Sequence, residues 1–173
     1  MYCVSSDTRD GSNSANFRSV FSHLPTGVVV VTGRDSQGNP LGITIGSFAS
    51  ISLDPPLAGF FIGRNSRTWP LIAASGKFSA NVLAADQGDL CWRFAKDNSE
   101  GSRFADLRLT ASANGSPVLP GVVAVVDCKI GDVHQVGDHD LVVGEVTDLR
   151  VVDDSRPSMV FFKGKTGDAH IDQ

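Results

Sequence analysis

Cysteine is scarce in this sequence, with three residues among 173, and they lie far apart at Cys3, Cys91 and Cys128. An odd number of widely spaced cysteines fits neither a disulfide framework nor a zinc site. The pattern instead predicts free thiols in a reducing compartment. The amino terminus also lacks the basic start and apolar core of a signal peptide, so we expect a cytoplasmic protein.

Long apolar runs and basic clusters are missing as well. No run approaches the roughly 20 residues of a membrane-spanning helix, so we expect no membrane partner. The chain has 15 Lys and Arg against 19 Asp and Glu, a net charge of −4, and no basic cluster accompanies aromatic residues. Nucleic acid is therefore not an expected partner either.

The signatures of several common enzyme sites are absent. No G-x-G-x-x-G follows an expected strand, which argues against a doubly wound dinucleotide fold. The Gly-Lys-Thr at 164–166 is not a phosphate loop, because Met159 stands where that loop needs glycine. No Ser, His and Asp set has the spacing of a nucleophile elbow.

Two histidines, His134 and His139, lie five residues apart with aspartates nearby but without a third strong ligand, so no metal site is expected. Two other interpretations stay open. One is a turn histidine held by a neighbouring carboxylate. The other is a His139 that faces a ligand and donates a hydrogen bond or a proton to it.

The hydrophobic pattern predicts one mainly β domain at 15–166, between a disordered lead at 1–14 and a polar tail at 167–173. Expected strands are 27–32, 42–53, 57–63, 77–84, 122–135, 140–152 and 158–162. Short helices are expected at 17–24, at about 67–74 and at 86–94, the last capped by Asp86. The Ser, Gly, Asn and Pro-rich stretch 98–121 predicts a functional loop or lid. Because strands are long and do not alternate with helices, we expect a closed or partly closed antiparallel barrel.

The strand expected at 42–53 has an unusual pair of faces. One face is apolar, and the other carries hydroxyls: the first holds Ile43, Ile45, Ala49, Ile51 and Leu53, and the second holds Thr44, Gly46, Phe48, Ser50 and Ser52. A glycine inside a strand marks a bulge or a close approach of a ligand to the backbone. A bulge near Gly46 would turn Ser47 toward the hydroxyl face. We interpret this face as the floor of a ligand groove, and a half-exposed strand with ordinary surface hydroxyls is the alternative.

The next turn, RNSRTWP at 64–70, favours an anion site. Ser66 or Asn65 is expected to cap a helix that starts near Arg67 or Thr68. The N–H groups of such a terminus, together with basic side chains, can bind a phosphate. A solvated basic turn is the alternative.

Five blocks taken together resemble the flavin reductase family, the small split β-barrel reductases that partner two-component flavin-dependent monooxygenases. The blocks are PTGVVVVT at 25–32, GITIGSFASISLDPPL at 42–57, NSRT at 65–68, FSANVLA at 78–84 with Gln87 and RFA at 93–95, and GDH at 137–139. The resemblance implies a split antiparallel β-barrel with a few short helices. It also implies an NAD(P)H:flavin oxidoreductase that transfers a hydride from NADH or NADPH to FMN or FAD. A homodimer and a monooxygenase that receives reduced flavin are implied as partners.

The resemblance also assigns site residues. The flavin ring and ribityl chain are expected at Thr44, Gly46, Ser47 and Ser50, the flavin phosphate at Asn65, Ser66, Arg67 and Thr68, further flavin contacts at Asn81 and Gln87, and the nicotinamide at Gly137, Asp138 and His139. Two departures from the family pattern stand out. Gly46 replaces a serine found in many relatives, and Thr166 with a polar tail replaces a terminal aromatic. A flavin-binding electron carrier without NAD(P)H turnover, and an interaction barrel without a cofactor, are the alternative functions.

Overall fold

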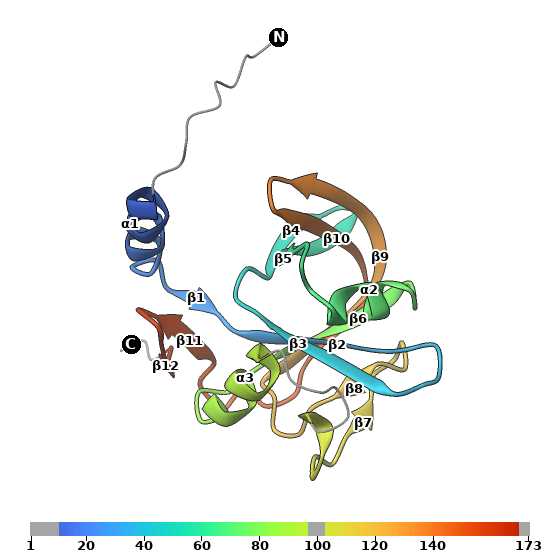
Figure 1. Ribbon diagram of the computed structural model, residues 1–173. Helices are drawn as coiled ribbons and strands as arrows, with labels where there is room; N and C mark the ends of the chain where they lie inside the picture. Colours follow the sequence, from blue (N-terminus) through green and yellow to red (C-terminus); the bar gives the residue numbers. More distant parts are fainter. Residues whose placement is uncertain (1–10, 97–102, 170–173) are drawn as a thin grey trace.

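The chain is organised around one long, strongly curved antiparallel sheet, with a smaller sheet and helices beside it (Figure 1). The computed structural model describes residues 11–96 and 103–169. The helices of these residues are α1 (Gly11–Phe21), α2 (Thr68–Ala73) and α3 (Gly88–Ala95). The strands are β1 (Thr26–Gly27), β2 (Val29–Arg34), β3 (Pro40–Ile45), β4 (Ala49–Leu53), β5 (Pro56–Gly63), β6 (Lys77–Val82), β7 (Thr110–Ala111), β8 (Pro117–Val118), β9 (Ala124–Val136), β10 (His139–Val151), β11 (Met159–Phe162) and β12 (Lys165–Asp168).

The large sheet has the strand order β3-β2-β6-β9-β10-β5-β4, and β1, β11 and β12 form a smaller sheet. The two edge strands of the large sheet, β3 and β4, follow each other in the chain with only residues 46–48 between them. Such a link spans at most roughly 14 Å, whereas seven strands laid flat would separate the edges by roughly 29 Å. The sheet must therefore curl until its edges approach each other. The edges are not paired in the described part of the chain, so this is the expected split antiparallel barrel.

Strand β2 lies between two hydrophobic clusters. Val29 and Val31 belong to the cluster inside the barrel, whereas Val28 and Val30 belong to a second cluster on the other side. A strand buried on both faces has a continuous apolar run in its sequence instead of alternation. This explains the unbroken valines of this segment.

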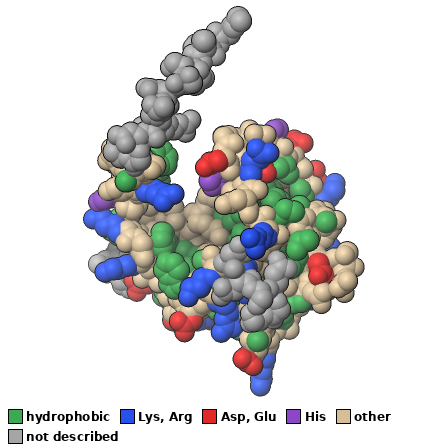
Figure 2. Space-filling view, in the orientation of Figure 1, with side chains coloured by type: hydrophobic (Ala, Val, Ile, Leu, Met, Phe, Trp, Pro, Cys, Tyr) green, Lys and Arg blue, Asp and Glu red, His purple; other side chains and the backbone are tan. Residues whose placement is uncertain are grey.

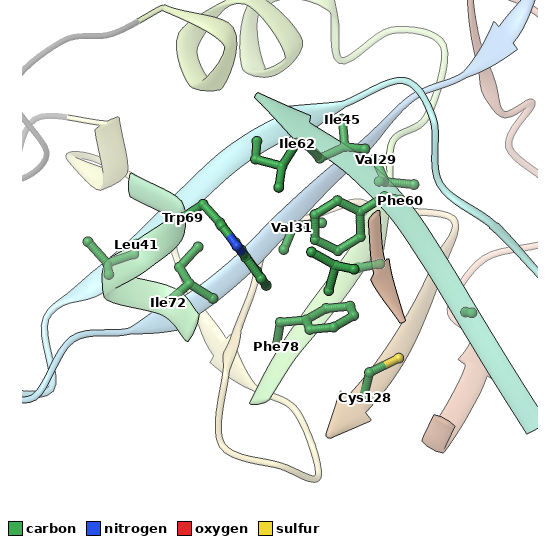
Figure 3. Packing of buried hydrophobic residues seen from close by; sticks show 13 residues of the cluster. Val29, Val31, Leu41, Ile45, Phe60, Ile62, Trp69, Ile72, Phe78 and Cys128 are labelled. Carbon is green, nitrogen blue, oxygen red and sulfur yellow. The ribbon is translucent and has the colours of Figure 1, made fainter. Parts of the chain in front are cut away.

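Aromatic rings fill the cluster inside the barrel and hold α2 against it (Figure 3). The ring of Phe60 on β5 lies 5.3 Å from Trp69 on α2 and 5.4 Å from Phe78 on β6, in both cases edge to face. Each ring pair of this geometry contributes about 0.5–1.5 kcal/mol beyond the burial of its area. Because Trp69 is an anchor in the core, the turn just before it is fixed in space.

The second cluster packs α3 and the segment from residue 103 onward against the sheet. Phe94 and Phe104 are in ring contact at 4.9 Å, and Leu119 and Val122 are buried. The expectation of a loop or lid at 98–121 is wrong for its described part, which forms the β7–β8 hairpin and contributes to the core. Residues 97–102 lie outside the described residues.

Two local expectations are also wrong. The alternation predicted along 42–53 does not cross the break at 46–48, so Ile51 and Leu53 of β4 are 50% and 94% exposed instead of buried. Asp86 does not cap α3, whose N-cap is Gln87. The Asp86 carboxylate instead accepts a hydrogen bond from Arg156, which lowers the pKa of Asp86.

The chain ends differ from expectation as well. Helix α1 begins at Gly11, inside the lead that was expected to be disordered, and β12 runs to Asp168, past the expected domain limit at 166. Residues 1–10 and 170–173 lie outside the described residues. Within the described ranges, no helix has both the length and the apolar character that crossing a membrane requires.

Candidate functional site

The break between β3 and β4 directs the predicted hydroxyls to different neighbours. The Ser47 hydroxyl donates to the carbonyl of Phe61 at 3.2 Å and accepts from its N–H at 3.0 Å, so it replaces a backbone partner for β5. The Thr44 hydroxyl donates to the carbonyl of Cys91 on α3 at 2.8 Å. Ser50 is exposed on β4. The prediction of one groove floored by a row of hydroxyls is therefore wrong.

The same break leaves backbone donors available. In the described part of the chain, the N–H groups of Gly46, Ser47 and Phe48 make no hydrogen bond to protein. Gly46 and Ser47 are exposed, and Phe48 is half-buried. Exposed amides at a sheet edge are suitable donors for the polar edge of a flat ligand.

The turn between β5 and α2 is held by Ser66. Its N–H donates to the carbonyl of Gly63 at 2.9 Å, and its hydroxyl accepts from the N–H of Trp69 at 3.2 Å. Helix α2 begins at Thr68 with Arg67 at the N-cap position, within the range that the sequence predicts. Ser66 therefore satisfies one amide of the first turn from the residue before the N-cap.

This turn lines a pocket of about 230 Å³, together with the end of α3 and Arg103. The lining residues are Ile43, Ile62, Gly63, Asn65, Ser66, Arg67, Thr68, Phe94, Ala95, Lys96 and Arg103. Three cationic side chains thus meet around one small cavity. Arg103 is only 4% exposed, and its guanidinium donates to the carbonyl of Gly42 at 3.1 Å.

Sequence reasoning missed two of these cations, Lys96 and Arg103. Both are far from the NSRT turn in the chain and reach it only because α3 and the segment after it pack against β3. Their charge is the only local signal, and it does not distinguish them from surface residues. Arg103 is distinguished from surface residues by its burial, because a charged side chain is seldom buried unless it is paired with other groups.

The tip of the β9–β10 hairpin lies beside this turn. His139 is paired with Gly63 in the β5–β10 ladder, and the N–H of Arg64 donates to the carbonyl of Asp138 at 3.1 Å. His139 Nδ1 lies 2.8 Å from Asp138 Oδ1. Residues 137–139 and 65–68, which are distant in sequence, therefore meet at Gly63.

Gly63 has a steric role at this junction. A Cβ atom added there would lie 2.9 Å from Asn65 Oδ1 and 3.9 Å from His139 Nε2. The first of these distances is too short for a comfortable contact, so a side chain would push into the space between the turn and the hairpin tip. The absence of a side chain keeps this space open.

Two larger cavities continue from the hairpin tip. One, of about 440 Å³, is lined by Gly63, Arg64, Asn65, Asp138 and His139. The other, of about 840 Å³, is bounded by Phe61, Val136, Asp138 and His139 on the barrel and by Ser14, Phe17 and Arg18 on α1. Figure 2 shows the molecule hollowed between α1 and the barrel. Shared lining residues join the three cavities in a row, with Gly63 and His139 as the links.

Asn81 and Gln87 do not line these cavities. Asn81 is fully buried, donates to Thr32 Oγ1 at 3.0 Å and accepts from the N–H of Leu119 at 3.0 Å. Gln87 accepts from the N–H of Ala84 and donates to the carbonyl of Pro120. Their side-chain amides are engaged within the fold, and their role as flavin contacts stays a prediction.

The arrangement suits a flat molecule that carries a phosphate. Cations and hydroxyls around the 230 Å³ pocket match a phosphate group, but this pocket alone is smaller than the roughly 300–1,000 Å³ of typical ligand sites. The adjoining cavity at His139 supplies the remaining room. Cys91 is not a candidate nucleophile, because burial raises the pKa of its thiol and keeps it protonated at neutral pH.

Comparison with known sequences gives a consistent result. The model of the flavin reductase like domain matches residues 21–170. The chain is 42% identical over 151 residues to a flavin reductase of Pseudomonas putida, covering 87% of each protein. It is 38% identical to the reductase subunit HsaB of a flavin-dependent monooxygenase of Rhodococcus jostii, covering 94% of this chain and 84% of that protein. An FMN reductase (NADH) of Agrobacterium fabrum is 40% identical, with coverage of 79% and 76%.

Solved structures show the same relationship. Component B of a nitrilotriacetate monooxygenase from Mycobacterium thermoresistibile superposes with a TM-score of 0.86 at 36% identity, covering 92% of this chain and 88% of that one. An NADH:FAD oxidoreductase of Streptomyces globisporus, solved with NAD and FAD fragments, has a TM-score of 0.85 at 30% identity. The coverage in that case is 96% and 99%.

Proposed function

Because this chain belongs to the flavin reductase-like domain family, we propose that it transfers a hydride from NADH or NADPH to FMN or FAD. It is an NAD(P)H:flavin oxidoreductase. The observation that carries this function is the junction at Gly63, where the phosphate-binding turn and the His139 hairpin tip adjoin connected cavities. An electron carrier without NAD(P)H turnover is not favoured.

The flavin is assigned to the cavities between α2 and the barrel edge. Asn65, Ser66, Arg67 and Thr68 hold its phosphate, and Lys96 and Arg103 add two further cations. The segment with Thr44, Gly46, Ser47 and Ser50 stays in the proposal through its backbone, because the Thr44 and Ser47 hydroxyls already bond within the fold. Unpaired amides at 46–48 are the donors for the polar edge of the flavin ring.

Hydride transfer itself is chemistry that a bound flavin and a nicotinamide supply. The contribution of the chain is to hold two flat rings in contact and to exclude water from between them. Gly137, Asp138 and His139 border the nicotinamide side of the site. The Asp138 carboxylate accepts the Nδ1–H of His139, which leaves Nε2 to contact the nicotinamide carboxamide. The sequence alone suggests a donor role for this histidine.

The proposal extends to partners. Exposed apolar side chains, with Leu53 of β4 at 94% and Leu149 and Val151 of β10 at 65% and 67% exposure, favour a homodimer. A flavin-dependent monooxygenase is the proposed recipient of the reduced flavin, by analogy with the HsaB subunits. A cytoplasmic location is proposed as well, in line with the buried free thiols Cys91 and Cys128.

A turnover assay tests the function. NADH or NADPH absorbance is followed with purified protein and with FMN or FAD added in excess. Steady oxidation of many equivalents per protein supports the reductase. A bound yellow species with little turnover would point to an electron carrier. If the protein neither binds flavin nor oxidises the nicotinamide, it would instead be a barrel with an interaction role and no cofactor. Titrating both flavins and both nicotinamides in the same assay determines the preferred pair.

A further inference from the structure

Helix α1 forms one wall of the largest cavity beside His139. Ser14, Phe17 and Arg18 line this cavity of about 840 Å³. They stand at positions i, i+3 and i+4, which share one face of a helix. The opposite wall is Phe61 of β5 and the tip of the β9–β10 hairpin. Figure 2 shows basic side chains on the helix side of this hollow and a histidine on the barrel side. The helix therefore faces the proposed nicotinamide contact across an open space.

Arg18 makes no polar side-chain contact with another residue in the described part of the chain. Its side chain is exposed, and within the described residues its guanidinium takes part in no hydrogen bond and no ion pair. Among the residues that the structure describes, it is also the only Lys or Arg that lines this cavity. On the opposite wall, Asp138 is engaged with His139 Nδ1 at 2.8 Å. Arg18 is thus a positive charge that faces the cavity and is available to a ligand.

We propose that Arg18 binds a phosphate group of the reduced nicotinamide dinucleotide, while His139 contacts its nicotinamide end. This inference rests on the proposed function and adds a binding residue from α1. Both NADH and NADPH carry a pyrophosphate, and a guanidinium matches phosphate oxygens with paired donors. A cavity of about 840 Å³ lies within the usual range for small-molecule sites. Phe17, which is 60% exposed, adds apolar surface beside Arg18 for a base or a ribose.

The test compares Arg18→Gln with Lys165→Gln, which removes the same charge from an exposed position on β12 outside the cavity. For Arg18→Gln we expect KM for NADH to rise about tenfold, the size of one partly exposed charged hydrogen bond, with kcat and the flavin Kd unchanged. Lys165→Gln should match the wild type. Arg18→Lys should recover part of the affinity, since it keeps the charge but loses the paired donors. Equal thermal unfolding midpoints establish that the variants are folded.

Two further substrates separate the phosphate groups. Reduced nicotinamide riboside carries no phosphate, so wild type and Arg18→Gln should oxidise it equally. Equal rises in KM for NADH and NADPH assign Arg18 to the pyrophosphate, and a rise for NADPH alone assigns it to the 2′-phosphate. Unchanged KM for both dinucleotides, or an equal loss with the riboside, would overturn the inference. Failure of the wild type to oxidise NADH with any flavin would instead refute the proposed function.

Discussion

Two groups of polar side chains in this molecule have similar composition and opposite surroundings. The polar core group comprises Thr32, Ser79, Asn81, Ser112, Asn114 and Asp127 on and beside β6. Its Ser79 hydroxyl bonds to Asp127, and Asn81 bonds to Thr32. The junction group comprises Asn65, Ser66, Arg67, Asp138 and His139 around Gly63. The first group is mostly buried, whereas the second is mostly exposed and lines connected cavities.

The contrast shows what a polar residue in a sequence block can mean. In the polar core group the side chains satisfy one another and the nearby backbone, as buried polar atoms must. In the junction group, side chains such as Arg67 and His139 line connected cavities that together have room for a ligand. Asn81 and Asn65 both stand in blocks that resemble the family, yet they belong to different groups. The following substitutions test whether the groups separate stability from binding.

The largest effect is expected for Asn81→Ala. The change removes the bond to Thr32 and leaves the buried N–H of Leu119 without its acceptor, so the free energy of unfolding should fall by about 2–4 kcal/mol. Urea unfolding measures this. Asn65→Ala is the matched control and should change stability by less than about 0.5 kcal/mol. A normal stability for Asn81→Ala with a large loss of flavin affinity would erase the distinction between the groups.

Arg67→Ala should weaken the binding of a flavin phosphate. Removing one cation from the pocket of about 230 Å³ should raise the Kd for FMN roughly 10- to 30-fold, as expected for a charged hydrogen bond to phosphate. Fluorescence titration of the flavin provides the measurement. Riboflavin lacks the phosphate, and its affinity should be the same for wild type and variant. A parallel loss of riboflavin binding would place Arg67 at the ring.

His139→Ala should divide the junction group into a flavin side and a nicotinamide side. We expect KM for NADH to rise, or hydride transfer to slow, by roughly tenfold with nearly normal flavin affinity, because the histidine contributes one hydrogen bond. Stopped-flow reduction of bound flavin separates the two steps. His134→Ala removes an exposed histidine of β9 that lines none of these cavities. It should change neither KM for NADH, nor the rate of hydride transfer, nor the flavin affinity. Equal loss of flavin binding in His139→Ala would argue that this histidine lies on the flavin side.

The last effect is confined to alkaline pH and concerns Cys128, next to Asp127 of the polar core group. Burial, with a smaller contribution from Asp127, raises the pKa of the Cys128 thiol to about 12 from an ordinary value of 9.0. As the pH rises, the Cys128 thiol loses its proton in the unfolded chain before it does so in the folded protein. The contribution of this group to the free energy of unfolding is therefore complete below pH 9 and is lost between about pH 9 and 12. The unfolding equilibrium should shift by at most about tenfold per pH unit from this group. Cys128→Ala should show a flatter pH dependence of urea unfolding in that range, and an identical slope would contradict the assignment.

The sequence predicted the parts of this fold that depend on local pattern. Apart from the one expected at 42–53, the expected strands agree with the structure within a few residues, as do the start of α2 and the hairpin turn at 137–138. The meeting of the NSRT turn with the GDH turn could be expected only through the family resemblance, because nothing local connects segments about 70 residues apart.

Other features depended on distant partners. The strand expected at 42–53 is interrupted at Ser47, whose hydroxyl bonds to the backbone of Phe61. The Asp86 carboxylate accepts a hydrogen bond from Arg156 and does not cap α3. Asn81 stands in a block that resembles the family, and its side chain bonds to Thr32 and Leu119. Lys96 and Arg103 joined the site through packing alone. In each case the deciding interaction joins residues far apart in the chain, so no local pattern could reveal it.

The ladder between β5 and β10 runs without interruption from Leu57 opposite Glu145 to Gly63 opposite His139, whereas the β9–β10 and β4–β5 ladders each contain irregularities. In an uninterrupted ladder, the number of residues in each strand determines which two residues are paired at its end. Inserting or deleting one residue within β5 or β10 would bring a neighbour of His139 to Gly63 and point it to the opposite face. Changes of length in β4 do not move this end point, so we expect the paired segments Leu57–Gly63 and His139–Glu145 to tolerate less variation in length than β4.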